Sequence, residues 1–357
     1  MKYLFILVLL IYIGGNIYLF RHSINAMTAL PSWVRIIWAV TFWTAAFSLF
    51  ISIGLRNTTM PDTISRFLFN LGSIWMVFLL YMVLTLAVAD IISFIVPSFD
   101  GRFWYSAVLV TAILIAGNIS YHHPKVEHIQ IDLKKQFDKQ HLRIVAVSDI
   151  HLGHGTGTKD LSKYVDLINA QNPELIIIAG DMIDNSIAPL LKNPFDKELA
   201  RLSAPIYMAP GNHEYISGID DCIDYLSSTG INVLKDSVIT LPEGIQIIGR
   251  DDRTNKHRQT LETLLETVDK EKPIIVIDHQ PYDLARTASL GIDIQISGHT
   301  HAGQIWPLSL IIDMMYEQGH GYRKWNNTHI WVSSGLSLWG PPFRLGTRSD
   351  MAVIDLL

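Results

Sequence analysis

Residues 142–151 read LRIVAVSDIH, a largely apolar run of six residues followed by serine, aspartate and histidine. A short apolar run bounded by polar residues is typical of a buried strand. The pattern recurs along residues 142–357, and amphipathic segments separate several of the runs. Strands that alternate with helices predict an α/β domain. The expected strands are 142–148, 175–179, 206–209, 245–249, 274–277, 292–296, 330–333 and 351–354, and the expected helices are 159–170, 220–229, 258–270 and 282–289.

Polar motifs follow five of these expected strands. Ligands of open α/β sheets bind at the carboxyl ends of strands, so the motifs occupy the positions that a binding site needs. The side chains concerned are carboxylates, an amide and imidazoles. The motifs are Asp149-x-His151, Gly180-Asp181, Gly211-Asn212-His213-Glu214, Asp278-His279 and Gly298-His299-x-His301.

Seven of these side chains indicate a metal centre. Carboxylate and imidazole ligands together suit Mn, Fe, Zn, Co or Ni. Seven groups are too many for one tetrahedral ion, and they suit two ions about 3.5–4 Å apart. Alternate residues of an extended chain face the same side, so each Asp-x-His or His-x-His pair is expected to converge. The candidate ligands are Asp149, His151, Asp181, Asn212, His279, His299 and His301.

Each motif alone has a simple structural explanation. Gly211 and Asn212 could form a turn, because both residue types tolerate a positive φ. His299 and His301 could be a pair at the surface. The five motifs together, in this order and at strand ends, favour one site over five unrelated structural features.

The order of the five motifs resembles that of the calcineurin-like metallophosphoesterase superfamily, and the resemblance extends over residues 142–357. The run HTHAGQ at 299–304 is similar to the membrane-associated branch with the YaeI- and YkuE-type proteins. The resemblance implies a sandwich of two mixed β-sheets flanked by helices. It also implies a first metal on Asp149, His151 and His301, a second on Asn212, His279 and His299, a bridging Asp181, and a catalytic His213 near the scissile phosphate.

The first 120 residues differ in composition from the rest. They contain nine charged side chains, whereas the remaining 237 residues contain 52. A membrane-spanning helix needs about 20 largely apolar residues, and the segments 3–20, 36–55, 67–89 and 103–119 qualify. A cleaved signal peptide would explain only the first of them. We therefore expect a four-helix transmembrane domain at 1–120, a linker with an entry strand at 121–141 and a metallophosphoesterase domain at 142–357. A small lysine and arginine bias favours a cell-membrane protein with a cytoplasmic catalytic domain.

Several residues outside the motifs have two possible roles. Arg344 and Arg348 lie in an expected loop, where they could bind substrate phosphate oxygens or form ordinary surface pairs. His154, in a glycine-rich loop, could bind the same phosphate or be a plain loop residue. Asp184 could support the site, but capping of the next helix is favoured. The apolar stretch 305–315 could pack in the core or against another domain, or it could form a lipid-facing entrance.

Composition narrows the class of function. Apolar residues make up 49% and charged residues 17% of the chain, and the net charge is −5. These values exclude a disordered chain and a nucleic-acid binder driven by positive charge. A single cysteine, Cys222, excludes a disulfide-built scaffold. The sequence predicts a membrane-anchored two-metal phosphoester hydrolase with the bilayer as partner and a lipid-linked substrate such as UDP-2,3-diacylglucosamine. The alternatives are a phosphodiesterase for soluble nucleotide-type substrates and a non-catalytic receptor or scaffold.

Overall fold

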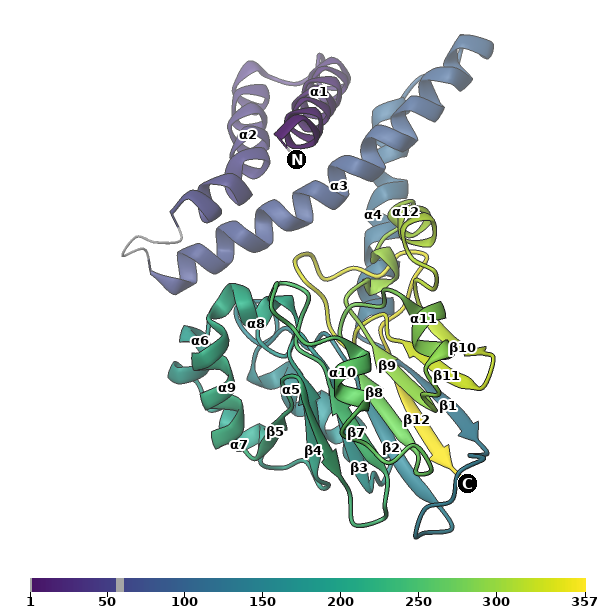
Figure 1. The fold of residues 1–357 in the computed structure, drawn as a ribbon. Helices are drawn as coiled ribbons and strands as arrows, with labels where there is room; N and C mark the ends of the chain where they lie inside the picture. The colour runs from purple at the N-terminus through teal and green to yellow at the C-terminus, as the bar shows by residue number, and fades with distance from the viewer. Residues whose placement is uncertain (1, 56–60) are drawn as a thin grey trace. The chain divides into compact units, whose positions relative to one another are not determined.

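The computed structural model describes residues 2–55 and 61–357, which form two compact units. The first unit comprises residues up to Ile119 together with Gly340–Phe343, and the second comprises Ser120–Trp339 and Arg344–Leu357. In Figure 1 the first unit consists of helices, whereas the second contains two sheets with helices around them.

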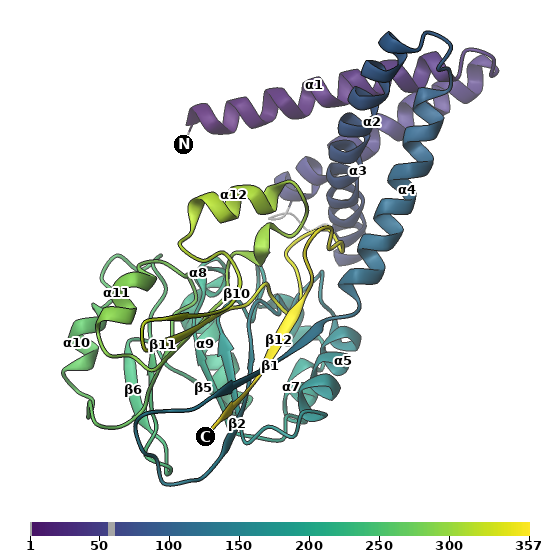
Figure 2. The ribbon, with the colours of Figure 1, turned by 90° about the vertical axis from the view of Figure 1, so that its right-hand side faces the viewer.

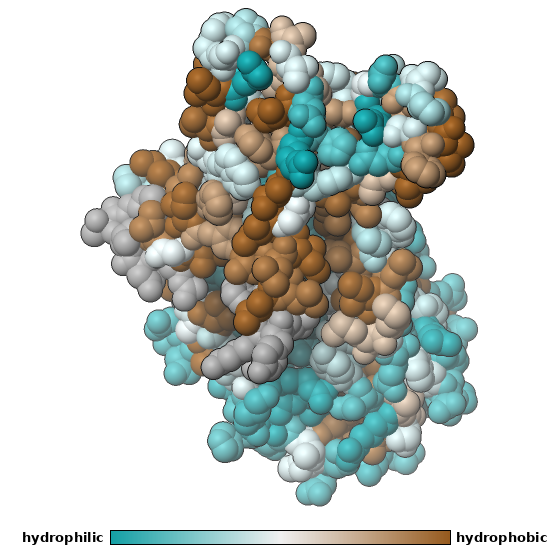
Figure 3. Space-filling view, turned by 90° about the horizontal axis from the view of Figure 1, so that it is seen from above, coloured by the Kyte–Doolittle hydropathy of each residue, from teal (hydrophilic) through white to brown (hydrophobic). Residues whose placement is uncertain are grey.

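The helices α1 (Lys2–Ala26), α2 (Ser32–Gly54), α3 (Asp62–Ile95) and most of α4 (Arg102–Tyr121) belong to the first unit. Within the described residues, all four are long and apolar enough to cross a membrane, which confirms the four expected spans. Pro31 and Pro61 directly precede α2 and α3. Proline suits a helix start, because its missing N–H would have no helical partner there. Brown, hydrophobic side chains cover much of the face of this unit that Figure 3 shows.

Small and polar side chains join these helices. Gly72 of α3 lies so close to α2 that an added Cβ would be 2.3 Å from the backbone nitrogen of Leu49. Close contact through small residues is a common mode of helix association in membranes. The buried Asn16 of α1 accepts a hydrogen bond of 2.9 Å from Trp75 Nε1 of α3. These two polar side chains between the apolar helices are therefore paired, as a membrane interior requires.

The second unit is a sandwich of two mixed six-stranded sheets. In spatial order, one sheet contains β1 (Lys125–Ile131), β12 (Asp350–Leu356), β2 (Leu142–Val147), β3 (Leu175–Ala179), β4 (Ile206–Ala209) and β5 (Ile231–Val233), and the other contains β10 (Gly321–Trp325), β11 (Thr328–Val332), β9 (Ile294–Ser297), β8 (Ile274–Ile277), β7 (Gln246–Gly249) and β6 (Ser237–Thr240). The neighbours β2, β3 and β4 run parallel, as do β7, β8 and β9. Figure 2 shows the two layers from the side. This architecture confirms the expected fold.

Apolar side chains fill the space between the two sheets. Ile144 and Ile177 of one sheet pack in a single buried cluster with Ile247, Ile275 and Ile296 of the other. Because side chains alternate along a strand, the opposite face of the first sheet is also apolar, and α5 (Thr158–Asn169) and α9 (Ile219–Ser228) cover it. Burial of one side chain of this size stabilises the fold by about 1.5–3 kcal/mol. The strand ends that carry the polar motifs are therefore held on a rigid support.

All eight expected strands form, as do helices within the four expected helical segments, although 258–270 contributes only α10 (Leu261–Leu265). The segment 121–141 was expected to hold a linker and an entry strand, and its strand is β1, which pairs with β12 along seven residues at 125–131. This edge strand exposes several polar side chains. The unexpected elements are too short for a clear periodic signal: β5, β6, β10, α6 (Ala188–Lys192), α7 (Phe195–Leu199), α8 (Asn212–Ser217) and α12 (Leu308–Met315).

Candidate metal centre

The five motifs lie together at the carboxyl ends of the central strands. Backbone hydrogen bonds join their loops: the Asp149 N–H donates to the Gly180 carbonyl at 3.0 Å, and the Gly298 N–H donates to the His279 carbonyl at 2.9 Å. The loops thus support one another. Asp149 and His151 follow β2, Asp181 follows β3, Asn212 follows β4, His279 follows β8, and His299 and His301 follow β9.

Five of the candidate ligands have a left-handed backbone conformation. The φ angle is between 49° and 73° at Asp149, His151, Asp181, His299 and His301. Such values are uncommon for residues other than glycine, and they concentrate at functional sites. These φ angles show that the expected geometry of the ligand pairs was wrong. The pairs converge through turns and not through the alternation of side chains along a strand. The strand β2 ends at Val147, two residues before the first ligand.

Glycine is required where two of these loops touch their neighbours. A Cβ on Gly211 would lie 2.2 Å from Oδ1 of Asp181, and a Cβ on Gly298 would lie 2.4 Å from Oδ2 of Asp149. Both distances are far below van der Waals contact, so a larger residue would displace a carboxylate. This contact explains why a glycine precedes the polar residue in these motifs.

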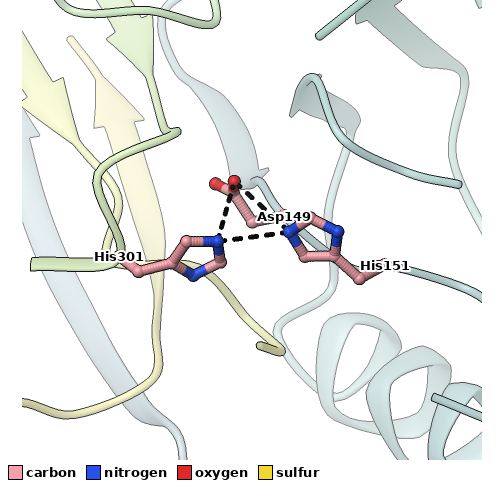
Figure 4. Close-up of side chains that lie close together, drawn as sticks. All are labelled: Asp149, His151 and His301. Atoms are coloured by element: carbon pink, nitrogen blue, oxygen red, sulfur yellow. Dashed lines mark hydrogen bonds and ion pairs between the residues drawn. The ribbon is translucent and has the colours of Figure 1, made fainter. Parts of the chain in front are cut away.

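Asp149, His151 and His301 form the first group of candidate ligands (Figure 4). The Nε2 atoms of the two histidines are 3.2 Å apart. Oδ1 of Asp149 lies 3.8 Å from Nε2 of His151 and 3.5 Å from Nε2 of His301. The carboxylate is fully buried. Three electron-pair donors that face one another in a buried space suit a bound cation. The cation would balance the charge of the buried carboxylate.

Asp181, Asn212, His279 and His299 form the second group. Nδ1 of His279 donates to the Ala179 carbonyl at 2.7 Å, so Nε2 is the atom that would bind a cation once its proton is lost. That Nε2 lies 3.2 Å from Oδ2 of Asp181 and 3.2 Å from Oδ1 of Asn212. The same Oδ2 of Asp181 is 4.0 Å from Nε2 of His151 in the first group. Asp181 therefore lies between the two groups, where a bridging ligand would be.

Burial and neighbouring charges shift the pKa values of these groups in both directions. Burial lowers the pKa of His299 to about 4 and the pKa of His301 to about 3, so both rings are neutral near pH 7. Burial alone would lower the pKa of His279, but Asp181 raises it well above the usual value. Burial alone would raise the pKa of Asp149, but His301 and the other imidazoles hold it well below the usual range. A cation would thus meet an ionised carboxylate and displace a proton from His279.

His213 lies beside the two groups, as expected. Its ring centroid is 4.6 Å from that of His151, and its backbone N–H donates to Oδ1 of Asp181 at 2.8 Å. Oδ1 of Asp184 lies 3.1 Å from Nδ1 of His213 and 3.8 Å from Nδ1 of His151. The expected capping role of Asp184 was wrong, because α6 begins only at Ala188 and has no side-chain cap. Asp184 instead faces two histidines of the site.

The structure corrects the expected role of Arg344. This side chain is only 1% exposed, and protein acceptors surround its guanidinium group. The group ties the backbone of His301 to the loop 334–337, so it supports a ligand loop and does not face substrate. Its partners are the carbonyl oxygens of His301 (2.7 Å), Ser334 (2.5 Å), Gly335 (3.1 Å) and Ser337 (3.0 Å), and Oγ of Ser349 (3.2 Å).

The other two candidate substrate contacts stay predictions. Arg348 is exposed and donates from Nε to the His123 carbonyl at 3.0 Å, which leaves part of its guanidinium at the surface. His154 is half-buried in the turn between Gly153 and Thr156.

Three residues near the site lacked an assigned role in the sequence. Glu214 is buried and accepts backbone N–H groups from Asp181, Ile183 and Gly211 at 2.7–3.0 Å. Its place three residues after Gly211 is the signal of a capping box. The ring centroid of Tyr316 lies 6.4 Å from that of His299, and the ring centroid of Trp339 lies 6.5 Å from that of His213. No sequence pattern connects these aromatic residues to the histidines, because tertiary folding alone brings them together.

The fold and the donor set define a class of protein: an α/β sandwich with a centre for two divalent cations. The family model for calcineurin-like phosphoesterases matches residues 142–303. Members of this family use two divalent metal ions, and the two Asp/His groups fit that requirement. The chain belongs to the calcineurin-like phosphoesterase family.

Three relatives show how far the similarity extends. A metallophosphoesterase of Campylobacter jejuni is 30% identical over 71% of this chain and 69% of its own length. A transmembrane protein with metallophosphoesterase domain from Danio rerio is 32% identical over 70% and 62%, respectively. YkuE of Bacillus subtilis is 29% identical over 60% and 78%, which confirms the expected YkuE-type relationship. For several relatives, the match spans only 62–64% of the relative's length.

Proposed function

We propose that this chain is a membrane-anchored hydrolase of phosphoesters that works with two divalent cations. The observation that carries the proposal is the convergence of carboxylate, amide and imidazole donors on two adjacent points. Two-cation centres of this kind are suited to displacement at phosphorus. In this proposal Asp149, His151 and His301 hold one cation, Asn212, His279 and His299 hold the other, and Asp181 contacts both.

The bound cations supply an acidified water and neutralise charge on phosphate oxygens. The residues of the chain supply orientation and a proton. His213 lies outside both groups of ligands but next to them, where its protonated ring can donate to the leaving oxygen or stabilise the developing charge. Oδ1 of Asp184 lies 3.1 Å from Nδ1 of His213, so this carboxylate is placed to contact the ring on the side away from the leaving oxygen.

A lipid-linked substrate is the proposal that best uses the membrane part of the chain. One span would be enough to anchor an enzyme of soluble substrates, whereas this chain has four candidate spans. The last of them, α4, ends at Tyr121, and β1 begins at Lys125. The hydrolase unit thus follows the last candidate span directly in the chain, as suits an enzyme whose substrate is held in the bilayer. UDP-2,3-diacylglucosamine, which has a pyrophosphate between a nucleoside and a lipid, is the candidate to test.

The test uses the purified full chain in lipid nanodiscs loaded with Mn²⁺. Two substrates are offered in parallel: UDP-2,3-diacylglucosamine and the soluble diester bis(p-nitrophenyl) phosphate. We expect release of UMP from the lipid with a kcat/KM at least about tenfold above that for the soluble diester, a difference of about 1.4 kcal/mol in transition-state binding. Hydrolysis of the soluble diester alone would remove the lipid proposal and support a general phosphodiesterase. Metal-loaded protein that is inactive on both would favour the receptor or scaffold.

We also propose that the second unit lies in the cytoplasm. Lysines cluster soon after the last span, and cytoplasmic segments next to membrane spans carry an excess of such residues. The test places an epitope tag at the C-terminus and treats sealed right-side-out membrane vesicles with protease. The tag is expected to survive until the vesicles are permeabilised. Digestion of the tag in intact vesicles would show that the second unit lies outside the cell. The lysines concerned are Lys125, Lys134, Lys135 and Lys139.

A further inference from the structure

The helix α12 is attached at both ends to the turn that carries His299 and His301. At its start, Gly303 has a φ of +73° and lies so close to the helix that an added Cβ would be 2.5 Å from the backbone nitrogen of Ser309. Beyond its end, the Gly319 carbonyl accepts a hydrogen bond of 2.5 Å from Oγ1 of Thr300, the residue between the two histidines. The position of α12 is therefore coupled to the position of the candidate ligands.

The outer surface of α12 is apolar and exposed. No residue of the helix is buried, so α12 itself does not pack in the core, although Ile305 just before it is buried. Its one charged side chain is that of Asp313. In Figure 2 the helix projects beyond the strands of the second unit. The exposed side chains of this surface are Trp306 (50%), Leu308 (42%), Leu310 (52%), Ile311 (46%), Met314 (79%) and Met315 (60%).

A contiguous apolar surface of this kind marks a contact with another apolar phase or a partner. The chain itself identifies the bilayer as the occupant. Three residues separate the last candidate span from β1, and they can extend over only about 10 Å. The second unit is therefore joined to a candidate span by a short tether, and a tethered surface that binds lipid needs little affinity to remain bound.

We propose that the surface formed by Trp306, Leu308, Leu310, Ile311, Met314 and Met315 inserts into the interfacial layer of the bilayer. Aliphatic, methionine and tryptophan side chains on one short helix are the composition of an interfacial anchor. Trp306 suits the depth of the headgroups. The helix contains no lysine or arginine, so its insertion depends on apolar burial and not on anionic lipid.

Insertion of α12 would hold the turn of His299 and His301 at the level of lipid headgroups. Tyr316, the residue directly after α12, has its ring 6.4 Å from the ring of His299, which shows how close the anchor comes to the centre. The centre would then select phosphoesters that lie at the membrane surface. This consequence for the substrate rests on the proposed hydrolase function, whereas insertion itself does not.

The experiment reports insertion directly and needs no activity. Cys222 is fully buried and is replaced (Cys222→Ser) so that a single new cysteine can carry an environment-sensitive dye. The test site is Met314→Cys, and the control site is Glu271→Cys, an exposed position just before β8 and thus at the opposite end of the strands. Both variants are reconstituted as full chains in phosphatidylcholine nanodiscs, and an unchanged thermal transition confirms their folding.

Two quenchers then distinguish the environments of the dye. Nitroxide-labelled lipid is expected to lower the fluorescence at position 314 at least about twofold with little effect at 271, and aqueous iodide is expected to do the reverse. Equal iodide quenching at both sites would overturn the proposal, because the surface would then face water. A dye at 314 that neither quencher reaches would also overturn it and would indicate that protein covers the surface. The quenching results do not depend on activity, so they test insertion even if the hydrolase assay fails.

Discussion

Replacement of Asp181 by asparagine is expected to lower phosphoester turnover about 10³-fold or more while the chain stays folded. Cation contacts contribute several kcal/mol to transition-state stabilisation, and each 1.36 kcal/mol is a factor of ten in rate. Oδ2 of Asp181 lies 3.2 Å from Nε2 of His279 and 4.0 Å from Nε2 of His151. One carboxylate thus serves both groups of ligands, and the amide would remove its charge from both at once.

Asparagine is a sharper substitution here than alanine. Oδ1 of Asp181 accepts the backbone N–H of His213 at 2.8 Å, and an amide oxygen can still accept it. Alanine would leave that N–H unpaired, at a cost of about 1–3 kcal/mol of stability if it stays buried. The measurements are kcat/KM and metal content per chain, and they should fall together. The matched control is Asp220→Asn, an exposed carboxylate in the first turn of α9. Wild-type turnover with two bound metals in Asp181→Asn would refute the bridging role.

The central strands and the residues of the site could be predicted because their causes are local. The run LRIVAV at 142–147 forms β2 at those residues, and the run LIIIA at 175–179 forms β3. Both runs are apolar enough that only a buried strand accommodates them. The motifs at their ends could be placed because parallel strands bring their carboxyl ends together. The order of the motifs then distinguished a single site from scattered polar turns.

The features that sequence could not reveal depend on tertiary contacts. An arginine in an expected loop suggests a side chain at the surface, yet Arg344 is buried. Its guanidinium group donates to carbonyl oxygens that surround it. The left-handed φ of Asp149 and His151 follows from the loops that press on them, and no residue type there signals it. Likewise, the composition of the stretch 305–315 is compatible with a buried segment, and only the fold shows that no residue of α12 is buried. Composition therefore predicts whether a segment favours an apolar or a polar environment. The topology of the fold determines whether protein or solvent surrounds the segment.

Replacement of His213 by alanine is expected to lower turnover by about 10²–10⁴-fold, the range for loss of a positioned general acid. The metal content should not change, because His213 is outside both groups of ligands. The size of the loss should depend on the leaving group. A p-nitrophenolate leaves without help from a proton, whereas an alkoxide needs one, so the loss should be much greater for an alkyl ester.

Two further variants separate catalysis from positioning. His257→Ala, at an exposed histidine, is the matched control and should leave turnover unchanged. Asp184→Asn removes the charge 3.1 Å from Nδ1 of His213 but leaves the ring in place, so its loss should be smaller and should show the same leaving-group trend. An equal loss on both esters in His213→Ala would exclude a general acid and point to stabilisation of charge on the phosphate oxygens. A loss of bound metal in His213→Ala would contradict this role and would make His213 a ligand together with His151 and Asp184.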